Sequence, residues 1–448
     1  MTELQHILTA REERHLLRQQ IAEGHRMSVS LNLNVPGFPK SNELYSIFFS
    51  DAIARLQNWL MAHRVMIDTK QITILNRAAG DFFLAAVQST QLTVVQLKNL
   101  TESFEEGHPL GRFIDVDVAD SKGNLVSSGK TKPCFFCEEF PAMDCIHSKR
   151  HTFHELRSFQ IQKIEAYLSE IRLDRLSRRV STLAIRSVLY EISLTPKPGL
   201  VDMSGSGVHQ DMDYTLFLDS TAMISMHFQT LLMKGARCSS DELSSALPII
   251  RAVGLTMEQE MFAQTKGVNT QKGIIFLMGV SLFCAGYVLQ NKDEFCTEDF
   301  RKAVQVVCKD MVKSEFVEQD SSLTHGEVCF KKFSVGGIRQ EVEAGFPTVF
   351  DYGLPVLDQA RNTSVEALQR TLLALISGLD DTNVLYRSSK EVLDELQLLS
   401  REVLADFSMM NYQKIIRFCK NQGISPGGSA DLLSITIFIF LLKTNLTP

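Results

Sequence analysis

The sequence lacks the surplus of positive charge that general nucleic-acid binders carry. Its 448 residues include 46 Lys and Arg against 52 Asp and Glu, which gives a formal net charge of −6. Because no long-range positive field attracts polyanions, we expect no nucleic-acid partner. Any phosphate-bearing ligand must be held by Lys, Arg and backbone N–H groups placed locally around it.

The sequence also lacks the marks of disulfide bonding, secretion and membrane insertion. Nine cysteines, an odd number scattered along the chain, do not form a typical disulfide framework and favour a reducing cytoplasm. The first 20 residues are charged and helical in character, unlike an apolar secretory signal. The apolar stretches Ile274–Leu289 and Leu432–Leu442 are shorter than the about 18 residues of a membrane span. We therefore expect a cytoplasmic protein with two buried apolar helices and no membrane partner.

The chain length and a change in residue pattern along the chain predict a multidomain protein. A chain of 448 residues suggests two or three domains, and a hydrophobic content of 44% can fill their cores. The segment His154–Leu194 has little Gly or Pro and helical apolar spacing, and it joins a mixed first part to a second part without a convincing strand series. The prediction is an α+β domain at residues 1–172 followed by an all-α domain at residues 173–448.

Period-two segments mark strands in the first part. Val29–Val35 alternates apolar and polar residues and stops at Pro36 and Gly37, as a strand that enters a loop does. Gln71–Leu75 and Arg112–Val118 show the same period. Two further segments are predicted to be helical, namely Asp81–Val87 and Leu92–Phe104. The helices predicted in the second part are Asp219–Lys234, Ser240–Phe262, Thr297–Lys313, Val365–Gly378 and Lys390–Asn421.

Two aspartates in the segment RFIDVDV are the sharpest feature of the first part. In a strand, Asp115 and Asp117 point to the same face, with Ile114, Val116 and Val118 on the opposite, apolar face. Two close carboxylates repel unless a cation lies between them, and Mg²⁺ supplies that charge while also binding a di- or triphosphate. A solvated face of an edge strand is the alternative.

Two other motifs of the first part carry candidate ligands. The Pro- and Gly-fixed loop Asn34–Asn42 places Lys40, a cation suited to phosphate, directly after a strand, although an ordinary turn has the same composition. Downstream, three cysteines and three histidines have the ingredients of a structural zinc site, with free buried thiols as the alternative. They are Cys134, Cys137, Cys145, His147, His151 and His154, of which we select the three cysteines and His151.

In this order, the motifs resemble apo-citrate lyase phosphoribosyl-dephospho-CoA transferase over most of residues 10–170. The series is N-x-P-G-x-x-K, then EEGHPLGR ending at Arg112, then D-x-D, then C-x-x-C with C-x5-H. That family transfers the phosphoribosyl-dephospho-CoA part of a triphosphate-bearing precursor to a serine of the acyl carrier (gamma) subunit of citrate lyase and releases diphosphate. The resemblance implies a nucleotidyltransferase-type domain, an apo acyl carrier subunit as partner, Mg²⁺ on Asp115 and Asp117, and phosphate oxygens on Arg112.

The second part begins with a proline-fixed loop that is rich in charged side chains. Thr195–Asp202 (TPKPGLVD) carries Lys197, and His209, Asp211 and Asp213 follow shortly after it. For Asp211 or Asp213 alone, N-capping of the next helix is the favoured interpretation. Taken as a group, these side chains are better suited to a metal–nucleotide complex.

Gly-rich turns recur in front of predicted helices. Gly267–Gly273 (GVNTQKG) offers N–H donors and a favourable helix dipole to phosphate, with Asn269 and Lys272 in the loop, but it lacks the spacing of a P-loop. Ser425–Asp431 (SPGGSAD) opens the last apolar helix as another candidate phosphate cradle. Its candidate residues are Gly427, Gly428 and Ser429.

Two charged motifs lie between these turns. Gly336–Glu341 (GGIRQE) provides Arg339 and Glu341. Leu379–Asn383 (LDDTN) interrupts an apolar helical run and is followed by Arg387. Charged side chains in such a run are costly to bury unless they are paired or bound to metal, so we select Asp381 and Asn383 as site candidates.

Over nearly all of residues 180–445, the ordered series resembles triphosphoribosyl-dephospho-CoA synthase. In that family the 2′-hydroxyl of 3′-dephospho-CoA attacks C1 of the ribose of ATP, adenine leaves, and the triphosphate stays intact. The resemblance implies His209 as acid/base and Mg²⁺ on Asp213 and Asp381, with Asp211 as a further carboxylate. The expected substrate and phosphate ligands are Lys197, Asn269, Lys272, Arg339, Glu341, Asn383, Arg387, Gly427, Gly428 and Ser429.

The product of the second family is the substrate of the first, so the fusion implies a bifunctional enzyme. Two positions depart from the synthase pattern, because Gln271 replaces an expected histidine and Ser388–Ser389 replaces an expected glycine pair. Gln271 argues against an obligatory proton carrier at that position, or else implies a slower enzyme. The alternatives are the equivalent pathway for malonate decarboxylase and a carrier-protein-binding scaffold with a decayed synthase site.

Overall fold

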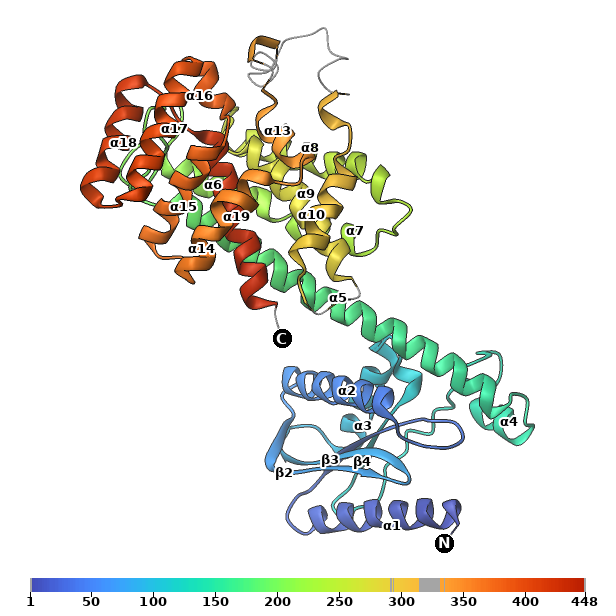
Figure 1. Ribbon diagram of the computed structural model, residues 1–448. Coiled ribbons are helices and arrows are strands. Elements are labelled where there is room, and N and C mark those ends of the chain that lie inside the picture. Colours follow the sequence, from blue (N-terminus) through green and yellow to red (C-terminus); the bar gives the residue numbers. More distant parts are fainter. Residues whose placement is uncertain (1, 291, 293, 314–330, 334, 447–448) are drawn as a thin grey trace. The chain divides into compact units, whose positions relative to one another are not determined.

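The computed structural model describes residues 2–290, 292, 294–313, 331–333 and 335–446. The chain folds as two compact units, Met1–Arg172 (unit 1) and Leu173–Pro448 (unit 2), each with a hydrophobic core of its own (Figure 1). The long helix α5 (Phe153–Ser193) begins in unit 1 and ends in unit 2.

Unit 1 is built on a four-stranded antiparallel sheet with the strand order β2-β3-β1-β4. The strands are β1 (Ser28–Leu33), β2 (Met66–Arg77), β3 (Gly80–Ser89) and β4 (Ile114–Ala119). Helix α1 (Glu3–Ala22) covers one face, where Ile21 packs with Phe82 and Leu84. Helices α2 (Glu43–Ala62) and α3 (Val94–Gly107) pack on the other face (Figure 1). Two short elements complete the unit, η1 (Gly111–Phe113) and α4 (Ala142–His147).

One secondary-structure prediction is wrong. The segment Asp81–Val87, predicted to be helical, lies in strand β3, a central strand in which Gly80 to Val87 are all buried. A short apolar run that is covered on both faces loses the polar/apolar alternation of a strand, so periodicity cannot distinguish it from a buried helix. The strand predictions at Val29–Val35, Gln71–Leu75 and Arg112–Val118 are confirmed by β1, β2 and β4, although Arg112 itself lies in η1. Helix α3 confirms Leu92–Phe104.

Unit 2 is largely helical, and its described residues form no sheet beyond a single bridge between Asp202 and Gly205. The helices after α5 are α6 (Tyr214–Ser225), α7 (Phe228–Ala236), α8 (Leu247–Gln264), α9 (Lys272–Leu289), α10 (Thr297–Val307), α13 (Gly337–Glu343), α14 (Leu354–Ala360), α15 (Val365–Gly378), α16 (Thr382–Arg387), α17 (Lys390–Ala405), α18 (Met409–Gln422) and α19 (Gly427–Asn445). Short helical turns lie at η2 (Leu243–Ser245) and η3 (Val349–Gly353). The predicted helices all coincide with one or two of these elements.

Helices α9 and α19 form the centre of unit 2. Both are long and apolar enough to cross a membrane by composition alone, yet 78% of each apolar window is buried inside the unit. Core helices of globular proteins have the same composition, since a helix that is apolar on all sides is buried on all sides. The two apolar stretches are therefore core helices, as predicted.

Candidate active sites

In unit 1, Asp115 and Asp117 lie on one face of β4, with their backbones opposite Asn32 and Ser30 of β1. Both aspartates are partly exposed, whereas Ile114, Val116 and Val118 are at most 1% exposed in the core. Burial, and then the charge of Asp115, raises the pKa of Asp117. A bound cation would relieve that repulsion.

Side chains of α3 complete this carboxylate face. They were not among the predicted site residues, although Glu105 opens the EEGHPLGR motif. The backbone N–H of Val116 donates to Oε1 of Glu105 at 2.7 Å, and Lys98 Nζ donates to the Val116 carbonyl at 2.8 Å. Strand β4 is an edge strand, so its outward backbone groups need partners, and α3 supplies them. Lys98 Nζ also lies 4.0 Å from both Glu102 and Asp117.

The segment after β4 adds cations to the same face. Lys132 Nζ contacts Glu105 Oε2 at 2.5 Å and Asp115 Oδ1 at 3.5 Å. Burial raises the pKa of Glu105, against the effect of the Lys132 hydrogen bond. Arg112, Glu105 and Lys132 line a small cavity of about 130 Å³ beside these carboxylates. Lys40 instead donates to the carbonyl of Val35 in its own loop, at 2.6 Å.

The cysteine-rich segment forms a compact cluster. The ligand atoms of Cys134, Cys137, Cys145 and His151 all lie within 4.8 Å of one another, so the four side chains could hold a metal ion. His147 is exposed and is not a member of the cluster, so the selection of His151 with the three cysteines is confirmed. Three thiolates and one imidazole form a ligand set typical of tetrahedral zinc.

In unit 2, the central contact joins the LDDTN and SPGGSAD motifs. Asp381 is 2% exposed, and its Oδ2 accepts from the N–H of Ser429 at 2.9 Å and from the Ser429 hydroxyl at 3.0 Å. Its Oδ1 accepts from the N–H of Asn383 at 3.0 Å, which caps α16. Burial raises the pKa of Asp381 and these hydrogen bonds oppose the rise. A side chain at Gly428 would come within 3.2 Å of Asp381 Oδ2.

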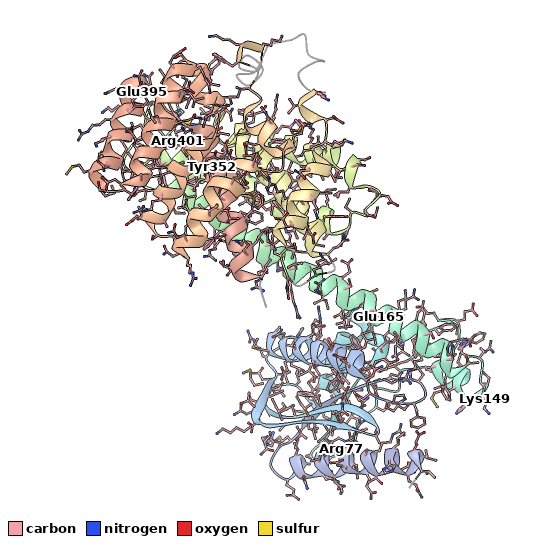
Figure 2. All side chains as sticks on the ribbon, in the orientation of Figure 1. Arg77, Lys149, Glu165, Tyr352, Glu395 and Arg401 are labelled. Atoms are coloured by element: carbon pink, nitrogen blue, oxygen red, sulfur yellow. The ribbon has the colours of Figure 1, made fainter. Side chains whose placement is uncertain are left out.

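The turn that carries Asp381 is fixed by the helix that follows it. Arg401 of α17 donates to the Ser377 carbonyl and Gln397 donates to the Leu379 carbonyl, both at 2.9 Å. These bonds satisfy carbonyls that the end of α15 leaves without helical partners. Figure 2 labels Arg401 among the helices of unit 2.

A second carboxylate of this region is Asp431, which was not among the residues predicted from the sequence. A side chain at Gly273 would come within 2.0 Å of Asp431 Oδ2 and 3.4 Å of Ile338 in α13, so the first turns of α9, α13 and α19 meet here. A side chain at Gly337 would likewise meet Thr382 of α16 at 2.6 Å. Burial, then the charges of Glu191 and Asp381, raises the pKa of Asp431 well above its usual range. The SPGGSAD motif contained this aspartate, and its place inside an apolar helix was the available signal.

His209 belongs to the same group of loops. Its Nε2 lies 3.0 Å from the hydroxyl of Ser425, in the turn that carries Ser429. Burial and the charge of Arg387 lower the pKa of His209, while Asp211 raises it. The imidazole is therefore mainly neutral at neutral pH, as a general base must be.

Other predicted residues have structural partners in unit 2. Lys197 is buried and paired with Glu191 at 2.7 Å, and Lys272 is paired with Glu258 at 3.0 Å. Asp213 is exposed and caps α6 through the N–H of Leu216.

Four more predicted residues, Glu341, Asn269, Arg339 and Asn383, lie in unit 2. Both oxygens of Glu341 accept hydrogen bonds from Thr348, and burial raises the pKa of Glu341. Asn269 accepts from the N–H of Lys272 at 3.2 Å. Arg339 is partly buried, and Asn383 lies against Gly427. A larger open cavity of about 860 Å³, between α7 and the start of α8, includes none of the predicted residues.

Comparison with protein families decides between these interpretations. Residues 2–167 match the family model of the apo-citrate lyase phosphoribosyl-dephospho-CoA transferase. Residues 177–447, more than half of the chain, match the family model of the ATP:dephospho-CoA triphosphoribosyl transferase. The chain belongs to the ATP:dephospho-CoA triphosphoribosyl transferase family.

Relatives match the chain over nearly its whole length or over little more than half of it. Protein CitXG of Leuconostoc mesenteroides subsp. cremoris is 28% identical over 99% of this chain and 98% of its own length. Protein CitXG of Haemophilus influenzae is 28% identical over 99% of this chain and 97% of its own length. A probable 2-(5′′-triphosphoribosyl)-3′-dephosphocoenzyme-A synthase of Malonomonas rubra is 38% identical over 60% of this chain and 90% of its own length.

The chain is therefore a bifunctional enzyme. It combines a triphosphoribosyl-dephospho-CoA synthase that acts on ATP and dephospho-CoA with an apo-citrate lyase phosphoribosyl-dephospho-CoA transferase. The predicted activities are confirmed. Neither the malonate decarboxylase pathway nor a carrier-binding scaffold is favoured. Residues 2–167 match the citrate lyase transferase family, and both CitXG relatives align with the chain over nearly its whole length.

Proposed function

We propose that the synthase reaction takes place in unit 2, residues 173–448, where the first turns of α9, α13, α16 and α19 meet. The observation that carries this proposal is the pair of hydrogen bonds from Ser429 to the buried Asp381. It supports a site in which buried carboxylates and backbone N–H groups from several turns face the same ligand. Helix N-termini favour the triphosphate, and the carboxylates Asp381 and Asp431 hold its Mg²⁺ or stabilise positive charge at the ribose C1.

Our proposed mechanism assigns proton transfer to His209. The 2′-hydroxyl of 3′-dephospho-CoA loses its proton to the neutral imidazole and bonds to C1 of the ATP ribose. The bond from C1 to adenine breaks with its electron pair on adenine, which takes up one proton and leaves as the neutral base, so no net proton is released. Lys272, Arg339 and Arg387 bind phosphate, and Asp211 and Asp213 add negative charge near the loop of His209. Lys197 is a positioning residue and does not bind phosphate itself, because its ammonium group is already paired with Glu191.

We propose that unit 1, residues 1–172, has nucleotidyltransferase-type chemistry and modifies a serine of the apo acyl carrier (gamma) subunit of citrate lyase. Asp115 and Asp117 bind Mg²⁺, Arg112 and Lys132 bind phosphate, and Zn²⁺ occupies the Cys134, Cys137, Cys145 and His151 cluster. The enzyme then works in the cytoplasm, where ATP, dephospho-CoA and reduced thiols are available.

Two assays on the purified chain test the proposal. ATP and 3′-dephospho-CoA should yield free adenine in a Mg²⁺-dependent reaction, and release of ADP instead would identify a kinase. Apo carrier subunit added to the same mixture should gain the mass of the phosphoribosyl-dephospho-CoA group. The acceptor would instead be the malonate decarboxylase carrier if that carrier gains the mass and the citrate lyase carrier does not.

A further inference from the structure

The Cys/His cluster, made of Cys134, Cys137, Cys145 and His151, is continuous with the carboxylate face of unit 1. Cys134 directly follows Lys132 and Pro133. The Pro133 carbonyl accepts from Arg112 Nη2 at 2.5 Å, and Lys132 contacts Glu105 and Asp115. The short segment Lys132–Pro133 therefore joins the cluster to two of the cations proposed to bind phosphate.

The position of this segment depends on the cluster. Backbone bonds join Cys134 N–H to the Phe140 carbonyl at 2.8 Å and Ala142 N–H to the Lys132 carbonyl at 3.0 Å. Pro133 also forms a bridge with Pro141. The backbone-to-backbone hydrogen bonds of this segment are thus made with the cluster's own loop, and among the described residues neither β4 nor α3 bonds to the segment backbone to backbone.

The four ligands come from three successive pieces of chain. Cys134 and Cys137 lie in the loop, Cys145 lies in α4, and His151 lies just before α5. A metal ion bound to all four would fix these pieces relative to one another, because its bonds have set lengths and tetrahedral angles. Ring contacts also support the loop: Phe135 packs against Phe113 and Phe159, and Phe136 packs against His151 and Phe159.

We infer that a zinc ion in the Cys/His cluster acts as a brace that positions Lys132 and Arg112 over the carboxylate face. This inference rests on the proposed transferase site of unit 1. It predicts that the metal supports carrier modification and is dispensable for adenine release, which depends on unit 2.

The test uses three full-length variants. His151→Ala removes one ligand, His151→Cys replaces it with a thiolate that also binds zinc, and His147→Ala removes an exposed histidine outside the cluster. Three quantities are measured: zinc per chain, hydrogen exchange of residues 127–134, and separate rates of adenine release and carrier modification with precursor supplied.

We expect His151→Ala to lose zinc, to exchange faster at residues 127–134, and to lose about 10- to 100-fold in kcat/KM for carrier modification, with a raised KM for the precursor. Adenine release should stay unchanged in all variants. His151→Cys should keep zinc and restore carrier modification, and His147→Ala should behave as the parent chain.

Other outcomes separate the brace from the proposed function. A chain that binds no zinc, or a zinc-free His151→Ala with unchanged exchange and unchanged carrier modification, overturns the brace and leaves the transferase assignment intact. If the parent chain fails to modify any carrier, the proposed acceptor is wrong, and the exchange of residues 127–134 still decides whether the metal orders the segment.

Discussion

Asp381 accepts two hydrogen bonds from Ser429, at 2.9 Å from its N–H and 3.0 Å from its hydroxyl, across 48 residues of sequence. Each residue lies in a turn at the start of a helix, α16 for Asp381 and α19 for Ser429. The pair therefore holds two helix N-termini together and leaves a buried carboxylate between them. Such a carboxylate is stable only while its donors stay in place.

Replacing Asp381 with Asn should lower the rate of adenine release by about 100- to 1,000-fold, because the charge proposed to face the ribose is lost and one of the two accepting oxygens becomes an NH2 group. Asp380→Asn is the matched control, since Asp380 is exposed and pairs with Lys390 at 2.9 Å. Steady-state adenine release measures the effect of both variants, and thermal unfolding of each variant checks that unit 2 is folded. Equal losses in the two variants would show that Asp381 has no specific role in the reaction.

The pH profile of adenine release should report His209. Burial and Arg387 lower the pKa of His209 from 6.5, so the neutral base is present at neutral pH and kcat/KM falls only when pH drops below about 6.5. Arg387→Ala removes a positive charge and should move this acid limb to higher pH. Asp211→Asn removes a negative charge and should move it to lower pH. Profiles that coincide in all three enzymes would mean that another group is the base.

A methyl group at position 273 should disturb the synthase site. In Gly273→Ala the new Cβ would lie 2.0 Å from Asp431 Oδ2, so Asp431 must move, and displacements of about 1 Å can cost about 100-fold in rate. The control is Gly254→Ala in α8, where the nearest atom is 3.8 Å away. The control should keep full adenine release and gain up to about 1 kcal/mol in free energy of unfolding. Normal activity of Gly273→Ala would show that Asp431 has no role.

The two reactions should be separable by mutation in unit 1. Asp117→Asn should reduce carrier modification by at least about 100-fold through loss of the metal, and adenine release should not change. Asp120→Asn is the control, because Asp120 binds the N–H groups of Lys122 and Asn124 in an exposed turn. Mass spectrometry of the apo carrier, with precursor supplied, follows the reaction. Retained modification in Asp117→Asn would argue against metal binding there.

Unit 1 should lose stability in mild acid through His108. Burial and Arg55 lower its pKa to about 4, so the folded state binds fewer protons than the unfolded state between about pH 4 and 6.5, and stability falls as pH decreases through that window. The expected loss from pH 7 to pH 5 is about 2 kcal/mol. Trp59, the single tryptophan of the chain, lies in α2 and reports unfolding of unit 1 in urea. His108→Gln should show a smaller loss, and an equal loss would assign the acid sensitivity to other groups.

Sequence patterns predicted most elements because their signals are local. Alternation identified β4, and Pro, Gly and Asp marked the turns in front of α6, α9, α16 and α19. The strand at Asp81–Val87 was missed because both of its faces are buried, a property of its neighbours. Glu105 belongs to the EEGHPLGR motif, but neither it nor Lys98 was selected as a site residue, because nothing local shows that a helix side chain will bond to the backbone of an edge strand.

By itself the sequence determined the two families, the loops that carry their polar residues, and the face that Asp115 and Asp117 share. Only the tertiary structure decided which groups meet: Lys197 pairs with Glu191, Asp431 lies against Gly273, and Lys98 and Glu105 reach the backbone of β4. The reason is physical. Turn and strand preferences depend on neighbouring residues, whereas a buried charge must find a partner wherever packing brings one, and that partner comes from any part of the chain.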